Sequence, residues 1–343
     1  MTLLQPYILA VVVAWAAYAQ SVPPQAQTDL ARGLAALDRG EYAAAVEELE
    51  KAQLIAPDSP EVADHLLAAY LEAGELDQAL RFGGNATTRW PKDPDAHHYL
   101  GLAYFKAGDL RRALLELQQG ERLEPNDFGI HYDVALVLLA ERQYSPAATE
   151  LEAAQKIHAN DAMAHLLLGR AYQNSNRTLE AIDEFKTVLR LAPDTPLAHY
   201  HLGFAYASLG ENQKAIGEYE KEVIGTGDNA EVQYQLGRTL LESGDSKAAL
   251  PHLERAAQLD PRNSEAAYDL GKALLTEGST EASERALERA VALNPSDPSP
   301  HYLLARALAK MGRSEDSRKE MQHFSELTKS QASSGGMATG RAH

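Results

Sequence analysis

One period governs this sequence: small residues recur every 34 positions along most of its length. The first series of such positions holds Gly101, Ala135, Gly169, Gly203, Gly237, Gly271 and Ala305. A second series with the same step holds Ala45, Ala79, Ala113, Ala147, Ala181, Ala215 and Ala249. Fixed periods of roughly 20–50 residues are typical of stacked repeats, in which each unit contacts only its neighbours. The period therefore argues against one closed core and favours recognition along an extended surface.

Helix-capping residues follow the same period. The side chains at eight such positions can accept a hydrogen bond from the first turn of a helix, namely Ser59, Asp93, Asp127, Asp161, Thr195, Asn229, Asn263 and Asp297. Proline follows directly at four of them, where its missing N–H is harmless. The sequence thus predicts two helices of roughly 12–14 residues per repeat. We expect the glycine and alanine series to face each other, so that a large residue at Gly203 or Ala215 costs about 1–3 kcal/mol.

The segment 198–221, AHYHLGFAYASLGENQKAIGEYEK, has small residues in both expected helices and an aromatic residue near the end of the first. With Pro57, Pro91 and Pro125 closing second helices, this pattern resembles the tetratricopeptide repeat. The resemblance covers residue 26 to about residue 327, about nine repeats. It implies an all-α fold, a right-handed α-solenoid superhelix of antiparallel helix pairs, with first helices lining the concave surface. Ser317 and Met321 depart from the pattern and suggest a C-terminal capping helix.

The N-terminal segment suggests export. No charged residue occurs in positions 1–28, and the apolar run 7–19 ends in Ala17-Tyr18-Ala19. Such a run is short for a bilayer span but suits a signal peptide. We expect a signal peptide at 1–19, a linker at 20–27, the repeats at 28–329 and a disordered tail at 330–343. The expected location is periplasmic or secreted; an uncleaved membrane anchor or a cytosolic chain are the alternatives, because no Lys or Arg precedes the run.

Composition argues against several functions. The net charge of -17 disfavours nucleic acid and anionic lipid as partners. The absence of cysteine excludes disulfides and thiolate chemistry. The sequence lacks the common catalytic and phosphate-binding motifs, so we expect neither an enzyme nor a cofactor.

Histidine also recurs, at His97, His131, His165, His199 and His301. Equivalent residues on neighbouring helices should lie about 10 Å apart, whereas zinc needs nitrogens about 2.0–2.1 Å from one ion. Partial burial in the repeat is therefore the favoured interpretation, and a metal site is disfavoured. A pH-dependent packing role is a further alternative.

The expected partner-binding groove follows from two rows of first-helix residues. Tyrosine recurs at Tyr132, Tyr200, Tyr234, Tyr268 and Tyr302, and one helical turn later stand Arg170, Phe204, Arg238, Lys272 and Arg306. Tyr and Arg are enriched at interface hot spots. Near the start Asp38, Glu61, Asp64 and Glu72 make the same face acidic. The alternative is that the tyrosines support packing between repeats while the basic residues pair with Glu231, Glu242 and Glu265.

Three functions remain open from the sequence. The first is a non-catalytic adaptor or scaffold that binds another protein, or an extended peptide with acidic or carboxylate features, outside the cytoplasm. The second is a non-catalytic subunit that recruits or regulates an enzyme acting on polymers or glycans. The third is a catalytic protein whose site shows no sequence signal.

Overall fold

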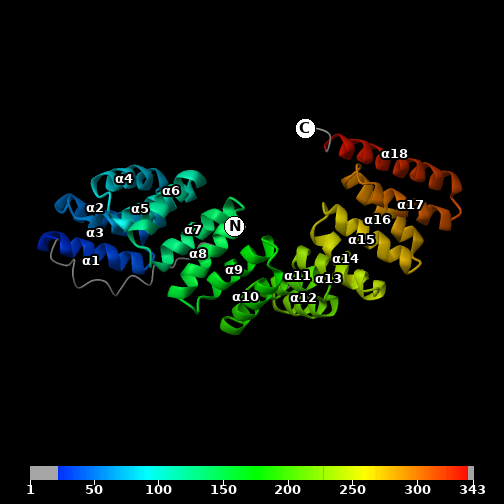
Figure 1. Ribbon diagram of the computed structural model, residues 1–343, viewed down its shortest axis with the longest axis horizontal. Coiled ribbons are helices and arrows are strands. Elements are labelled where there is room, and N and C mark those ends of the chain that lie inside the picture. The colour runs from blue at the N-terminus through cyan, green and yellow to red at the C-terminus, as the bar shows by residue number, and fades with distance from the viewer. Residues whose placement is uncertain (1–21, 227, 339–343) are drawn as a thin grey trace. The chain divides into compact units, whose positions relative to one another are not determined.

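A computed structural model describes residues 22–226 and 228–338, and every structural statement below concerns these residues. The expected signal peptide, 1–19, lies outside them. The described chain forms eighteen α-helices and no strand, and it divides into two compact units on either side of residues 176 and 177. Each unit is an α-solenoid of antiparallel helix pairs, which confirms the predicted fold class (Figure 1).

Unit 1 contains the first nine helices, which are α1 Pro24–Asp38, α2 Tyr42–Ile55, α3 Pro60–Ala73, α4 Leu76–Arg89, α5 Pro94–Lys106, α6 Leu110–Leu123, α7 Phe128–Ala140, α8 Tyr144–Ile157 and α9 Ala162–Asn174. Unit 2 contains α10 Thr178–Leu191, α11 Ala198–Ser208, α12 Asn212–Thr226, α13 Ala230–Glu242, α14 Ser246–Leu259, α15 Ser264–Thr276, α16 Thr280–Leu293, α17 Pro298–Lys310 and α18 Ser314–Ala338.

Consecutive first helices contact one another inside each unit. The pairs are α1 with α3, α3 with α5 and α5 with α7 in unit 1, and α11 with α13, α13 with α15 and α15 with α17 in unit 2. Contacts of similar extent between consecutive second helices are absent from the described residues. The first helices α1 to α7 in unit 1 and α11 to α17 in unit 2 thus form a continuous face within each unit, which we call the first-helix face.

The glycine series allows the two helices of a repeat to approach closely. A Cβ atom built on Gly237 would lie 2.7 Å from Leu253 Cγ and 3.1 Å from the Leu253 backbone nitrogen. Gly101 meets Leu117 at nearly the same distances in unit 1. At Gly203 the neighbours are the Tyr219 ring, at 2.9 Å, and the carbonyl oxygen of Ala215, at 3.2 Å. The glycine series therefore packs against the second helix at and just beyond the alanine series, whose members are fully buried.

Seven of the eight predicted caps accept a hydrogen bond from the first turn of their helix, as Asp127 does from the Ile130 N–H at 2.7 Å. The prediction for Thr195 is wrong. Its hydroxyl donates to the Ala192 carbonyl, and α11 begins only at Ala198 after Leu197, whose φ of 64° is left-handed. The carboxylate of Glu222 on α12 replaces the cap, accepting the N–H groups of Leu197 at 2.9 Å and Tyr200 at 3.2 Å.

Both ends of the repeat region differ from expectation. Helix α1 begins at Pro24, inside the expected linker, because proline suits a first helical turn and Val22 and Ala26 bury their side chains. Helix α18 continues to Ala338, into the tail expected to be disordered from 330, because no proline or glycine interrupts it before Gly335. None of the described helices combines the length and apolar character that a membrane crossing requires.

Candidate protein-binding face

The tyrosines of the predicted groove in unit 2 fall into two classes. Tyr234 on α13 is only 3% exposed, and its hydroxyl donates to Glu265 Oε2 on α15 at 3.0 Å. Tyr200 on α11 is half-buried, and its hydroxyl reaches Glu231 Oε1 on α13 at 3.5 Å. Each of these two tyrosines therefore joins its helix to the next first helix, as the packing interpretation predicted.

The other aromatic residues of this row remain accessible. Tyr302 on α17 is 41% exposed, with the guanidinium of Arg306 over its ring at 5.8 Å and Phe324 on its other side, 5.4 Å between ring centroids. Phe204 is 37% exposed and lies 6.3 Å from the Tyr200 ring. Tyr268 is partly buried. Exposed aromatic area thus lies at both ends of the row, on α11 and α17.

The basic residues one turn later are exposed. Arg238 Nε donates to Glu242 Oε1 at 3.0 Å on the same helix, so this ion pair of the alternative interpretation exists. Lys272 and Arg306 form no ion pair with an acidic side chain within the described chain. Two cations on α15 and α17 are therefore available to a ligand.

A buried carboxylate lies near two of the basic residues, Lys272 and Arg238. Asp269 on α15 is 9% exposed, and burial raises its pKa, against the effects of Lys272, Arg238 and the Tyr234 hydroxyl. Lys272 and Arg238 thus lie near an acid whose negative charge is disfavoured by burial. The face can offer aromatic surface and two unpaired cations, a combination suited to carboxylate-bearing peptide segments.

Two residues of the predicted groove, Tyr132 and Arg170, belong to unit 1. Tyr132 on α7 is partly buried and stacks on Phe128, with 5.7 Å between ring centroids, and Arg170 on α9 is exposed. The first-helix face of unit 1 holds acidic and imidazole groups instead. His98 on α5 contacts Asp133 on α7, with 2.6 Å between Nε2 and Oδ2. Burial opposes protonation of His98, but the Asp133 hydrogen bond and nearby carboxylates raise its pKa.

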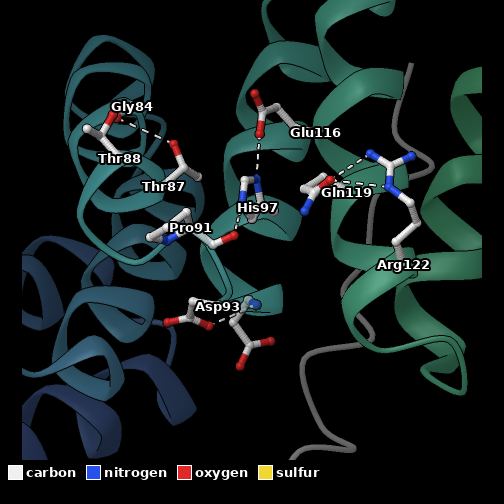
Figure 2. Close-up of polar contacts among 10 residues, drawn as sticks. Gly84, Thr87, Thr88, Pro91, Asp93, His97, Glu116, Gln119 and Arg122 are labelled. Atoms are coloured by element: carbon white, nitrogen blue, oxygen red, sulfur yellow. Dashed lines mark hydrogen bonds and ion pairs between the residues drawn. The ribbon is translucent and has the colours of Figure 1, made fainter.

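The recurring histidines form a second set of polar contacts. The sequence predicted that they are partly buried but did not predict their hydrogen-bond partners. His97 Nδ1 lies 2.7 Å from Glu116 Oε2 on the second helix of its repeat, and Nε2 lies 3.3 Å from the Pro91 carbonyl, as Figure 2 shows. His131 has the same contacts, at 2.7 and 3.0 Å. The same Nδ1–Oε2 contact recurs at His199 with Glu218 and at His301 with Glu320. The predicted structural role of these four histidines is thus a specific polar link inside their helix pairs, whereas His165 Nδ1 lies 2.8 Å from Gln155 Nε2 on α8, in the preceding repeat.

Both ring nitrogens of His97 and His131 face acceptors. A neutral imidazole carries only one N–H, so at His131 donation to both the carboxylate and the carbonyl requires the protonated ring. The pKa of His131 is raised chiefly by its hydrogen bond to Glu150, although burial acts against the charge. Glu121, His131 and Glu150 place ligand atoms within 4.8 Å of one another, but His131 already uses both nitrogens in these hydrogen bonds.

The hydrogen-bond partners of these histidines also recur in the sequence. Glu116, Glu150 and Glu218 lie on one 34-residue step, each 19 positions after a histidine of the series. In the repeat with Gln233 on the first helix, His252 stands at the corresponding second-helix position, and Nδ1 lies 2.8 Å from Gln233 Oε1. In this repeat the imidazole therefore stands on the second helix, and the hydrogen bond between the two helices is kept.

A depression of about 380 Å³ occurs elsewhere in unit 2, lined by Glu254, Ala257, Gln258, Pro261, Leu270 and Arg289. It includes none of the predicted groove residues, so it does not define the candidate face.

Comparisons with known proteins bear on the fold. Three sequence profiles, each of the tetratricopeptide repeat, match this chain, one over residues 166–231, 234–298 and 268–323, one over 70–132 and one over 26–51. No curated protein matches the sequence. The solved structure of PilF from Pseudomonas aeruginosa is similar, with a TM-score of 0.54 and 18% identity over 62% of this chain and 97% of PilF. The APC/C hetero-tetramer Cut9–Hcn1 gives 0.53 and 18%, over 78% and 52% of the respective chains.

Proposed function

This chain belongs to the tetratricopeptide repeat family, and from that premise we propose that it is a non-catalytic scaffold that binds another protein along the first-helix face of unit 2. Stacked helix pairs present extended surfaces rather than enclosed pockets, and this architecture indicates a protein-interaction scaffold. The observation that carries the proposal is the exposure of Phe204, Lys272, Tyr302 and Arg306 on three first helices of one unit.

The proposed partner is an extended segment that carries acidic side chains or a terminal carboxylate beside apolar residues. Lys272 and Arg306 would take the carboxylates, because neither is neutralised by an ion pair within the described chain. Phe204 and Tyr302 would supply apolar contact area. Tyr234 is not a contact residue in this proposal, because it is buried against Glu265.

We place this interaction outside the cytoplasm. The proposal rests on the uncharged apolar N-terminal run at 7–19, which suits a signal peptide. N-terminal sequencing of the protein from its native cells tests it. A mature chain that begins at Gln20 is expected, and an intact N-terminus in the cytoplasmic fraction would contradict it.

Site-specific photocrosslinking tests the binding face. A photoreactive amino acid at Phe204 should crosslink one protein species in cells, and the same probe at Ile224, 85% exposed on the second helix α12, should not. The double variant Lys272→Glu, Arg306→Glu should remove the crosslink. The matched control Arg285→Glu, Arg318→Glu makes the same charge change on the second helices α16 and α18 and should retain it. A crosslink that survives reversal of Lys272 and Arg306 would dismiss this face.

A further inference from the structure

Three carboxylates converge on the first-helix face of unit 1. Asp64 comes from the middle of α3, Asp93 is the N-cap of α5, and Asp95 lies in the first turn of α5. One oxygen of each lies within 4.8 Å of an oxygen of the other two. Asp93 also accepts the Asp95 backbone N–H on Oδ1 at 3.2 Å, which leaves its second oxygen for another contact.

Asp64 has a buried oxygen without a hydrogen bond among the described residues, although its carboxyl group shares a hydrogen bond with Asp93. It is 8% exposed, and its Oδ1 accepts no hydrogen bond within the part of the chain that the structure describes. Glu61 Oε2, one turn earlier on α3, is also buried without a hydrogen bond there. Burial, followed by the charges of Asp93 and Asp95, raises the pKa of Asp64 well above its usual range. A carboxylate this deeply buried is costly unless a proton or a cation accompanies it.

The nearby imidazole groups have other hydrogen-bond partners. His97 and His98, both on α5, are the cationic side chains that act on Asp93 and Asp95. His97 contacts Glu116 and the Pro91 carbonyl, and His98 contacts Asp133. Neither imidazole therefore supplies the missing counter-charge to Asp64.

The corresponding positions of unit 2 show what is unusual here. Tyr234 and Glu265 are 31 positions apart, as are Tyr200 and Glu231, and in both pairs the hydroxyl donates to the carboxylate. Asp64 and Asp95 are also 31 positions apart and occupy the same places in their repeats. Unit 1 thus has two carboxylates at the positions where unit 2 has a tyrosine hydroxyl, which donates, and a carboxylate, which accepts.

We propose that Asp64, Asp93 and Asp95 bind one hard divalent cation, of which Ca²⁺ is the best fit. Carboxylate oxygens are the ligands that this ion takes, at about 2.3–2.6 Å. Two oxygens bound to one Ca²⁺ can lie up to about 5.2 Å apart, and the three carboxylate oxygens lie within 4.8 Å of one another. The shorter Mg²⁺–oxygen distance of about 2.1 Å limits the separation to about 4.2 Å. Asp93 and Asp95 are partly exposed, so water can complete the coordination sphere.

Calorimetric titration of the full chain with CaCl₂ tests the site, together with thermal unfolding in CaCl₂ and in NaCl of equal ionic strength. We expect one-site binding and a calcium-dependent rise in Tm. Asp64→Asn should weaken Ca²⁺ binding about 100-fold or more, because even loss of a group that only supports a ligand costs about 10–100-fold. Without calcium this variant should be at least as stable as the parent, since it removes an unpaired buried charge.

Asp269→Asn is the matched control. Asp269 is a buried aspartate of a first helix in unit 2, with Arg238 and Lys272 as its nearby cations, so its removal should leave Ca²⁺ binding unchanged. The proposal is overturned by absence of binding up to about 10 mM CaCl₂, which exceeds the range of weak protein sites. Equal binding by Asp64→Asn, or equal loss in both variants, also overturns it. Asp95→Asn repeats the test should Asp64→Asn not fold.

Discussion

The two units use one backbone design with different side chains at the same repeat positions. In unit 2, Tyr234 and Glu265 join α13 to α15 by a hydrogen bond. In unit 1, Asp64 and Asp95 occupy these positions, and burial with mutual repulsion disfavours both charges. A stacked repeat tolerates such a substitution because the small residues between its helices determine the packing. The first-helix face is thus free to carry different chemistry in each unit.

The largest expected effect tests the close contact between the two helices of a repeat, which both units share. Gly101→Ala and Gly237→Ala should each lower the free energy of unfolding by about 1–3 kcal/mol, because the new methyl group would overlap Leu117 or Leu253. Urea denaturation measures the loss. Gly217→Ala on α12 is the control, since nothing lies within 4 Å of its added Cβ, and it should be neutral or stabilising. Clearly unequal losses at Gly101 and Gly237 would contradict a common packing design.

The next effect is the pH dependence of the stability of unit 1. Burial raises the pKa of Asp95 to about 6 from a usual value of 3.8. The folded state therefore holds the proton more tightly, so this stabilisation is complete below about pH 3.8 and is lost as pH rises through about 6. His131, whose pKa is raised above 6.5, acts in the same direction at higher pH.

We therefore expect unit 1, in the presence of a chelator, to be more stable at pH 5 than at pH 7.5, by on the order of 1–2 kcal/mol. Hydrogen-exchange mass spectrometry resolves the opening of α3 and α5 from that of α13 and α15. Asp95→Asn should reduce the difference in unit 1. Greater stability of α3 and α5 at pH 7.5 would show that the carboxylate cluster is not destabilising.

The smallest effect concerns the tyrosines. Tyr234→Phe should cost about 1 kcal/mol, because it removes the hydrogen bond to Glu265 while the exposed carboxylate regains water. Tyr268→Phe should cost less than about 0.5 kcal/mol, since no hydrogen bond of its hydroxyl occurs among the described residues. Thermal unfolding compares the two. Equal losses would mean that the Tyr234 hydroxyl does not join α13 to α15.

The fold could be predicted because its determinants are local and repeated. The caps such as Asp127 and the close contact at Gly237 each involve a short stretch of one repeat, so their spacing alone identifies them. The failure at Thr195 has a different origin. Glu222, from the second helix of the same repeat, reaches back to cap α11. It stands where other repeats have a small apolar residue, such as Ala256, but this departure does not reveal which groups its carboxylate contacts.

The face was harder to predict because exposure depends on the neighbouring repeat. Tyr234 and Tyr302 are equivalent in sequence, yet one is buried against α15 and the other is 41% exposed. The acidic start of the groove was predicted through Glu61 and Asp64, but the convergence of Asp64 with Asp93 and Asp95 was not. That convergence depends on how α3 packs on α5, which one sequence does not give.

In one repeat the histidine of the polar link stands on the second helix, as His252, and its partner Gln233 stands on the first. This arrangement has a consequence for how the protein can evolve. Where the imidazole link lies within a single hairpin, as at His97 and His252, a hairpin that is copied, deleted or moved keeps that hydrogen bond. Lengthening or shortening the protein by whole 34-residue modules should thus leave the remaining modules intact. An insertion inside a helix would instead disturb its own module and the adjacent ones, because each repeat contacts only its neighbours.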